Sequence, residues 1–315
     1  MRVLVIDERE VHALLSYAEC ITVMEEALTA LARDEADNPL RSKLSGRGAS
    51  GLLGLMPAYR GGNEPIYALK EVCVFPGNRA RGLDSHLGAV LLHSGTTGEL
   101  IAIVNASAIT AIRTAAVSAL ATRLLAREEA SVLAILGSGT QAEAHLAAIP
   151  LVRPIREVRI YSRSRAAGPH TASSAEKAVR GADIIVTATN SREPVLLREW
   201  VADGAHINAV GSSIASAREL DAATVGASSL FVDRRESTIN ESGDYLFALR
   251  EGAIVGPQHI RAEIGEILTG RAQGRHSPTE ITLFKSLGLA VEDLYAAAFV
   301  FEKAGRMGAG TLIDF

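Results

Sequence analysis

A glycine-rich turn between an apolar run and a helical repeat restricts the fold of this chain more than any other feature. Residues 131–136 (SVLAIL) have the pattern of a buried strand, and residues 140–150 (TQAEAHLAAIP) carry apolar residues at helical spacing. Between them stands the G-x-G-x-x-A pattern Gly137-Ser138-Gly139-Thr140-Gln141-Ala142. Its glycines permit a tight turn and a close approach to a pyrophosphate, whose charge then faces a helix N-terminus. The context predicts a dinucleotide site, and the alternative is a glycine turn without a ligand.

The order of predicted elements indicates an α/β protein of two domains. An Ala-rich helix at 107–127 is followed by alternating strands and helices, which is typical of a Rossmann-type, doubly wound parallel sheet. Upstream, the segment 15–32 predicts an amphipathic helix that begins behind Ser16. It precedes extended segments separated by Gly, Asn and Pro clusters, which predict an α+β domain with a mainly antiparallel sheet. The segment 277–304 is predicted to be helical and to return to the first domain.

One crossover of the predicted Rossmann sheet is missing. Too few residues separate Ser164 from the helix predicted near Ser173 to build a helix and a third strand. Either the chain lacks this crossover near 165–172, or residues are absent there from the sequence. We expect poor order or a chain break at 165–170.

The end of the second predicted strand indicates the type of nucleotide. A site that prefers NAD carries a carboxylate about 20 residues after the glycines, where it binds the ribose hydroxyls. Here the strand ends in Ser162, Arg163, Ser164 and Arg165. Hydroxyl and guanidinium groups suit a 2′-phosphate, so we expect NADP(H) to be preferred, with NAD(H) as the alternative.

The composition favours a small partner. The 315 residues carry a formal net charge of -4, which gives no electrostatic reason to expect nucleic acid or a membrane surface. Cys20 and Cys73 are far apart and lack CxxC spacing, and no metal-binding motif is present, so we expect no metal. The absence of a signal-peptide core and of a membrane-spanning apolar run predicts a cytoplasmic protein.

Two cations stand in apolar surroundings. Lys70 lies in the strand IYALKEVCVF and Arg113 in the helix ASAITAIRTAAVSAL, and acids are scarce in the sequence near both. An unpaired buried cation is costly, so a bound carboxylate would explain both residues. Alternatively, Lys70 extends outward at a sheet edge and Arg113 binds a carbonyl or an interface acid.

The motifs together resemble the ornithine cyclodeaminase/mu-crystallin family. They are LMPAY, LKEV, FPGN, AIRTAA, LGSGTQA, GADIIVTATNSREPVL, INAVGSS, ESGD and FKSLGLAVED, and they cover nearly the whole chain. The resemblance implies a homodimer and chemistry at the C–N bond of a small imino or amino acid. It also implies a substrate and dimerisation domain at 1–112 and 285–315 and a Rossmann domain at 113–284.

The resemblance also implies roles for individual residues. Arg41, Lys70 and Arg113 match the cations that bind the substrate carboxylate and handle protons, and Lys70, Arg113 and Ser213 are the expected catalytic residues. The expected cofactor-binding residues are Ser85, Gly137, Ser138, Gly139, Thr140, Gln141, Ser162, Arg163, Ser164, Thr189, Val210, Gly211 and Ser286.

Two departures from the cyclodeaminases favour a reductase. Where they carry a Gly-Gly-Asp segment this chain has Gly211-Ser212-Ser213, and where they carry a glutamate before LMP it has Gly54. Both changes resemble the mu-crystallin branch and remove a carboxylate, and a hydroxyl is no general base near neutral pH without activation. We therefore expect an NADPH-dependent ketimine reductase. The alternatives are an ornithine cyclodeaminase, an alanine-type dehydrogenase, and a non-catalytic protein that binds NADPH and a small acid.

Overall fold

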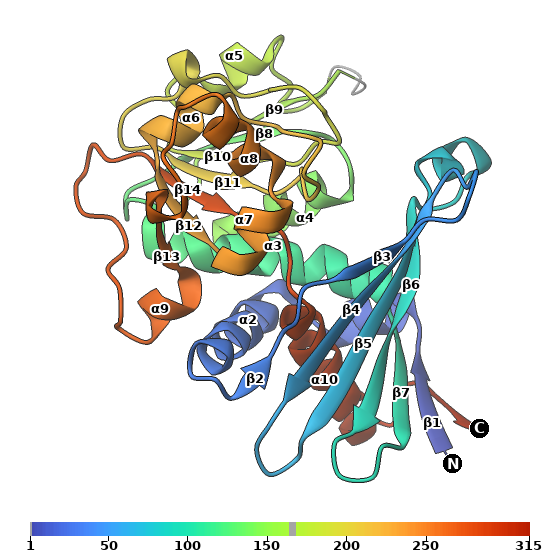
Figure 1. Cartoon of the computed structure of the whole chain (residues 1–315). Helices are drawn as coiled ribbons and strands as arrows, with labels where there is room; N and C mark the ends of the chain where they lie inside the picture. Colours follow the sequence, from blue (N-terminus) through green and yellow to red (C-terminus); the bar gives the residue numbers. More distant parts are fainter. Residues whose placement is uncertain (1, 164–167) are drawn as a thin grey trace. The chain divides into compact units, whose positions relative to one another are not determined.

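The computed structural model describes residues 2–163 and 168–315, apart from the side chain of Arg79. The chain divides into two compact units (Figure 1). The first unit comprises residues 1–113 and 289–315, and the second comprises 114–288. The long helix α3 (Ala106–Leu125) contributes to both units.

The first unit contains a mainly antiparallel sheet of eight strands in its described part, with the central order β15-β1-β7-β6-β5-β4-β2 and with β3 beside β4. The strands are β1 (Arg2–Ile6), β2 (Ala36–Asp37), β3 (Ser42–Leu44), β4 (Leu52–Arg60), β5 (Ile66–Val74), β6 (His86–Ser94), β7 (Leu100–Asn105) and β15 (Thr311–Asp314). The pairs β4–β5, β5–β6 and β6–β7 are antiparallel, as the sequence predicts, whereas β1 runs parallel to β7.

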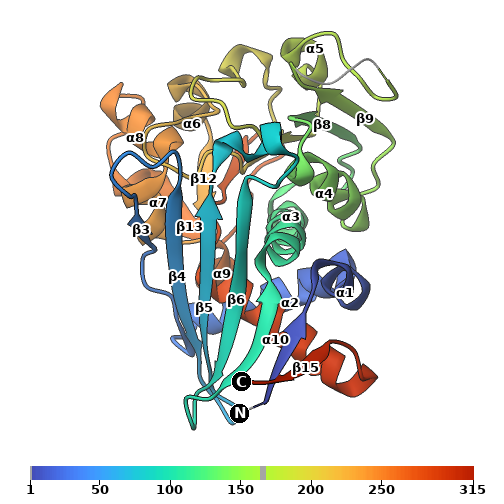
Figure 2. The ribbon, with the colours of Figure 1, turned by 90° about the vertical axis from the view of Figure 1, so that its right-hand side faces the viewer.

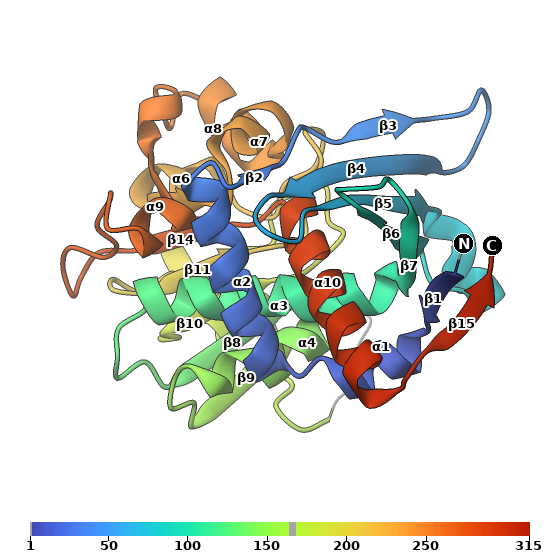
Figure 3. The same cartoon turned by 90° about the horizontal axis from the view of Figure 1, so that it is seen from below.

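Helices cover one face of this sheet. α1 (Glu8–Leu14) and α2 (Tyr17–Ala32) precede the central strands, and α10 (Ala290–Met307) follows from the far end of the chain. Ser16 caps α2 by accepting a hydrogen bond from the Glu19 amide, so the helix begins where the sequence predicts. α10 packs against α2, β4 and β5, and Figure 3 shows α2 and α10 side by side.

The second unit contains a parallel sheet of seven strands in its described part, with the order β13-β12-β14-β11-β10-β8-β9. The strands are β8 (Val132–Leu136), β9 (Glu157–Tyr161), β10 (Ile184–Thr187), β11 (His206–Ala209), β12 (Ser229–Val232), β13 (Ile260–Glu263) and β14 (Thr282–Lys285). The helices are α4 (Thr140–Ala148), α5 (Ala175–Val179), α6 (Ala222–Ala227), α7 (Arg235–Glu241), α8 (Gly243–Arg250) and α9 (Ile264–Leu268). These elements confirm the predicted doubly wound fold.

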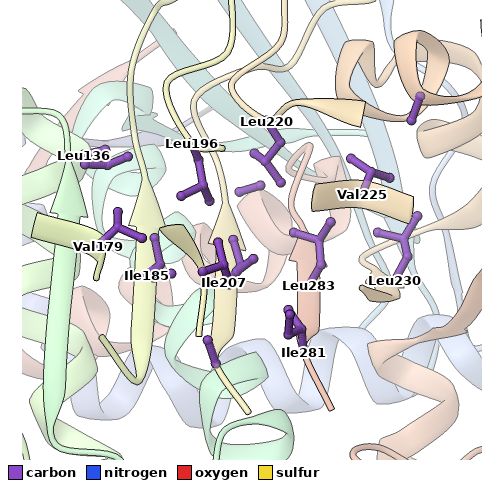
Figure 4. Close-up of a cluster of buried hydrophobic side chains, with 14 of the residues drawn as sticks. Leu136, Val179, Ile185, Leu196, Ile207, Leu220, Val225, Leu230, Ile281 and Leu283 are labelled. Carbon is purple, nitrogen blue, oxygen red and sulfur yellow. The ribbon is translucent and has the colours of Figure 1, made fainter. Parts of the chain in front are cut away.

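The core of the second unit lies against this sheet. Four neighbouring strands each contribute a side chain that is at most 1% exposed: Leu136, Ile185, Ile207 and Leu283. These side chains point toward a second apolar group, formed by Val179, Leu196, Leu220 and Val225 (Figure 4). Buried strands that are apolar on both faces are typical of parallel sheets, and burial of such side chains is the main favourable term in folding.

The prediction of one continuous helical segment over 277–304 is wrong. Its first part forms β14, which lies between β11 and β12 in the parallel sheet, and the helix begins only at Ala290. The strand is short and fully buried, so the alternating pattern that identifies a half-exposed strand is missing. Gly288, with φ at 75°, separates strand from helix.

The third strand of the first Rossmann half is reduced to one contact in the described residues. Thr171 forms a single parallel bridge with Ile160 of β9, and α5 follows a few residues later. Residues 165–167, half of the segment predicted to be poorly ordered, lie outside the described part, whereas 168–170 belong to it.

Helix α3 is long and apolar enough to cross a membrane by length and composition alone. However, 83% of its most apolar window is buried inside the structure, which is the behaviour of a core helix. Its hydropathy therefore reflects packing.

A buried histidine fastens α4 to α3. The His145 Nδ1 donates to the Gln141 carbonyl at 2.7 Å, and its Nε2 lies 2.9 Å from Ser118 Oγ, so the Ser118 hydroxyl is the donor to the neutral ring. Complete burial lowers the pKa of His145 to about 4, although the Gln141 carbonyl opposes this shift.

This histidine predicts a loss of stability in acid. Its ordinary pKa is 6.5, so the unfolded chain binds a proton first, and the free energy of unfolding falls as the pH drops from about 6.5 to about 4. At pH 5 the expected loss is about 2 kcal/mol. Urea unfolding measures the free energy of unfolding at pH 7 and at pH 5. The decrease between the two pH values should be smaller in His145→Gln than in wild type by about this amount. The control is His12→Gln, at an exposed site. An identical pH dependence in wild type and His145→Gln would contradict this assignment.

Candidate functional site

The first unit contains a buried cluster of charges built by β5, α3 and α10. Lys70 and Arg113 are each 4% exposed, and Glu292 and Asp293 are fully buried. Lys70 Nζ donates to both oxygens of Asp293, at 3.0 and 3.1 Å. Arg113 Nε donates to Asp293 Oδ1 at 3.0 Å, and its Nη1 donates to Glu292 Oε2 at 2.7 Å. Asp293 is therefore shared by both cations.

This cluster corrects the expectation that acids are scarce around Lys70 and Arg113. Glu292 and Asp293 are distant in sequence but lie in the first turn of α10, whose apolar residues face the sheet. The chain thus supplies the counter-charges, so burial of the two cations does not by itself require a bound carboxylate. Glu292 and Asp293 lie on the buried face of an amphipathic helix, and this position is a signal that the sequence offered.

Burial and the charge of Asp293 act in opposite directions on the pKa of Lys70. Desolvation lowers the pKa of the Lys70 ammonium from 10.5 to about 8, and Asp293 opposes this shift. The charges of Arg113 and Arg41 lower the pKa further, so Arg41 acts on the same cluster. Arg41 itself is half-buried, just before β3. A lysine with a pKa lowered in this way can bind an anion when protonated, or give up its proton near neutral pH.

The lysine titration gives a direct test of this cluster. NMR of protein labelled with ¹³C at lysine Cε should show Lys70 titrating near pH 8. Removal of the attracting carboxylate in Asp293→Asn disfavours the ammonium, so the pKa should fall by about one pH unit or more. Glu302→Gln, on the exposed side of α10, is the control. A Lys70 signal that titrates at the same pH in Asp293→Asn and wild type would contradict the pairing.

The second unit gathers most of the predicted cofactor residues at the carboxyl edge of its parallel sheet. Gly137, Ser138 and Gly139 follow β8, and Ser162 and Arg163 follow β9. Ser138 Oγ donates to Ser162 Oγ at 2.9 Å, which joins the turn to the next strand.

Thr189, Val210, Gly211 and Ser286 follow β10, β11 and β14 at the same edge. The Ser286 amide donates to the Ala209 carbonyl at 3.1 Å. Of the remaining predicted residues, Ser164 lies outside the described part, and Ser85 belongs to the first unit, where its Oγ lies 3.0 Å from His86 Nδ1.

The glycine turn has the shape that a pyrophosphate requires. Gly137 has φ of 134°, and a Cβ there would clash with the backbone of Ala188. Gly139 is the N-cap of α4 and offers no side chain to the amides of the first turn, where Thr140 and Gln141 lie. Such a helix start suits an anionic ligand, so the residues present fit a dinucleotide.

Ser213, the third predicted catalytic residue, lies in the loop after β11. It is half-buried, whereas the preceding Ser212 is 2% exposed and donates its hydroxyl to the Ala217 carbonyl. Ser213 is thus the more accessible hydroxyl of the pair.

Together the parallel sheet and the glycine turn define a Rossmann-type, dinucleotide-binding protein. The model of the ornithine cyclodeaminase/mu-crystallin family matches residues 2–307, and the chain belongs to this family. Mouse ketimine reductase mu-crystallin is 40% identical over 274 residues, which cover 84% of each chain.

Two solved structures are similar over nearly their full length. One is Thermococcus litoralis Δ1-pyrroline-2-carboxylate reductase in complex with NADH and L-proline, with a TM-score of 0.93, 37% identity and coverage of 98% of this chain and 99% of that one. The other is an archaeal alanine dehydrogenase dimer with bound NAD, with a TM-score of 0.93, 35% identity and complete coverage of both chains.

Proposed function

We propose that this protein is an NAD(P)H-dependent reductase of the C=N bond of a small, carboxylate-bearing imino acid. The observation that carries the proposal is the buried cluster of Lys70, Arg113 and Asp293 in a chain that also contains a dinucleotide-binding turn. Its similarity to a ketimine reductase and a pyrroline-2-carboxylate reductase supports the same reaction.

The cations of the cluster suit a substrate carboxylate. Lys70, Arg113 and Arg41 are cations that interact electrostatically, and Glu292 and Asp293 are the acids that pair with Lys70 and Arg113. We assign Arg41 and Arg113 to the substrate carboxylate, because a guanidinium binds carboxylates with two parallel hydrogen bonds.

The cluster favours reduction over amine oxidation. Both acids of the cluster are held in ion pairs, which stabilise their ionised form and make them weaker general bases. Reduction of a protonated imine needs no such base. When bound, the reduced nicotinamide supplies the hydride to the imine carbon. Lys70 polarises or protonates the nitrogen end, and Ser213 orients it.

For the cofactor we propose a preference for NADP(H). Arg163 is exposed just beyond the end of β9, beside the Ser162 hydroxyl, and a guanidinium there suits a 2′-phosphate. The two solved relatives contain NADH and NAD, which makes NAD(H) the alternative.

A second candidate activity is alanine dehydrogenation. The archaeal alanine dehydrogenase matches the whole chain, and its name fits the same C–N chemistry with pyruvate and ammonia as substrates.

A substrate screen tests the proposed activity. Purified protein should oxidise NADPH faster than NADH when given piperideine-, pyrroline- or thiazoline-2-carboxylate, and more slowly with pyruvate and ammonia. Absorbance at the nicotinamide band measures the rates. Tight NADPH binding with no turnover on any of these compounds would indicate a binding protein, and release of proline and ammonia from ornithine would indicate a cyclodeaminase.

The role of Lys70 can be separated from cofactor binding. Lys70→Met removes the proton donor but leaves the second unit intact, so turnover should fall about 100-fold or more, while the NADPH dissociation constant stays within about twofold. Stopped-flow reduction rates and fluorescence titration measure the two quantities. A turnover equal to that of wild type would remove Lys70 from the mechanism.

We also propose a homodimer formed through the first unit. Pro57, Leu69, Leu91 and Ile103 form one cross-strand row on the sheet face opposite Lys70, and each is half-buried. Among the described residues of the first unit, no helix is drawn in front of β4, β5 and β6 in the view of Figure 2. A half-exposed apolar sheet face is suited to a second copy of the chain.

Light scattering coupled to size-exclusion chromatography tests the dimer. Wild type should elute as a dimer, and Leu91→Arg should elute as a monomer because it places a charge in the apolar row. The control is Leu151→Arg, at a leucine that is 54% exposed in the second unit. A monomeric wild-type protein, or a dimer that Leu91→Arg leaves intact, would contradict the proposed interface.

A further inference from the structure

The carboxylate of Glu219 ties together the ends of two neighbouring strands in the second unit. It is fully buried and accepts three hydrogen bonds. Thr187 Oγ1, at the end of β10, donates to Oε2 at 2.8 Å, and the Thr189 amide donates to Oε1 at 2.6 Å. The Gly211 amide, just after β11, donates to Oε2 at 2.7 Å. One side chain thus fixes both loops.

Asp244 and Lys285 also hold the loop after β11. Asp244 Oδ1 accepts from the amides of Glu219 and Leu220, at 2.8 and 3.0 Å. Asp244 Oδ2 lies 3.0 Å from Lys285 Nζ, which donates to the Ser212 carbonyl at 2.6 Å. The segment Gly211–Ser212 is therefore bound at its amide by Glu219 and at its carbonyl by Lys285.

The geometry demands an acceptor at residue 219. The groups that donate to its oxygens include two backbone amides and a hydroxyl, so an ionised carboxylate satisfies them and a side-chain amide would turn an N–H toward at least one of them. Burial raises the pKa of Glu219, and the charge of Lys285 opposes this shift. A Cβ at Gly211 would clash with the Glu219 carboxylate and the Thr189 backbone, so glycine permits the close approach.

We propose that Glu219 is a positioning residue for the nicotinamide half of the dinucleotide. In a doubly wound sheet each half binds one mononucleotide, and the glycine turn after β8 and the end of β9 belong to the adenosine half. The loops after β10 and β11, which carry Thr189 and Gly211–Ser213, then face the nicotinamide half. This inference rests on the proposed function, because it requires a nicotinamide nucleotide as the ligand.

Two ligands separate a positioning role from a merely structural one. NADPH engages both halves of the site, whereas 2′,5′-ADP engages only the adenosine half. Glu219→Gln should weaken NADPH about tenfold or more and leave 2′,5′-ADP within about twofold of wild type, since only the loops after β10 and β11 lose their acceptor. Calorimetric titration of the full-length protein measures both dissociation constants. The matched control is Glu199→Gln, at an exposed carboxylate of the same unit.

Each result bears on the inference in a defined way. Selective weakening of NADPH supports it. Unchanged binding of both ligands, or equal weakening of both, overturns it, because the first shows no role and the second shows general damage. If wild type binds neither NADPH nor NADH, the proposed function itself fails, and this is seen before any variant is made.

A milder variant covers the case in which Glu219→Gln does not fold. Thr187→Val removes one of the three donors and keeps the carboxylate. It should weaken NADPH by about threefold and leave 2′,5′-ADP unchanged. Wild-type affinity for both ligands in Thr187→Val would then overturn the inference.

Discussion

The ion pair between Lys70 and Asp293 is the interaction on which the first unit depends. An ammonium on the buried face of a sheet is too costly to desolvate alone, and Asp293 offsets that cost with two hydrogen bonds to Lys70 while it also binds Arg113. The carboxylate comes from α10, near the C-terminus, whereas Lys70 lies in β5. The cluster therefore forms only when these two distant segments have folded together. Stability and the proposed chemistry therefore rest on the same side chains.

In the second unit, buried charges are likewise compensated, and they hold the loops in place. Lys285 is 1% exposed at the end of a central strand and is compensated by Asp244, while Glu219 is compensated by backbone and hydroxyl donors. Because these groups are buried, their hydrogen bonds are shielded from water and hold the loops in one arrangement. A rigid edge of this kind suits a site that must hold a dinucleotide in one arrangement.

The sequence predicted the elements that carry periodic patterns, but it did not predict which charged side chains pair with distant parts of the chain. The strand, glycine turn and helix at Val132–Ala148 and the cap at Ser16 follow from local rules. Strand β14 was missed because four buried residues show no alternation. Glu292, Asp293 and Glu219 were missed because most of their partners lie 30 to 223 residues away, and only folding shows which buried charges meet. Lys285, however, stands in an apolar run much as Lys70 does, so the rule that singled out Lys70 could have found it.

The central claim is that the cation cluster of the first unit receives a substrate carboxylate. A crystal structure with NADPH and pyrrole-2-carboxylate, a planar analogue of a cyclic imino acid that cannot be reduced by hydride, tests it most directly. The account predicts that the carboxylate of the analogue contacts the guanidinium of Arg113 or Arg41 while Asp293 keeps its ion pairs. A carboxylate bound elsewhere, with neither cation within hydrogen-bonding distance, would contradict it.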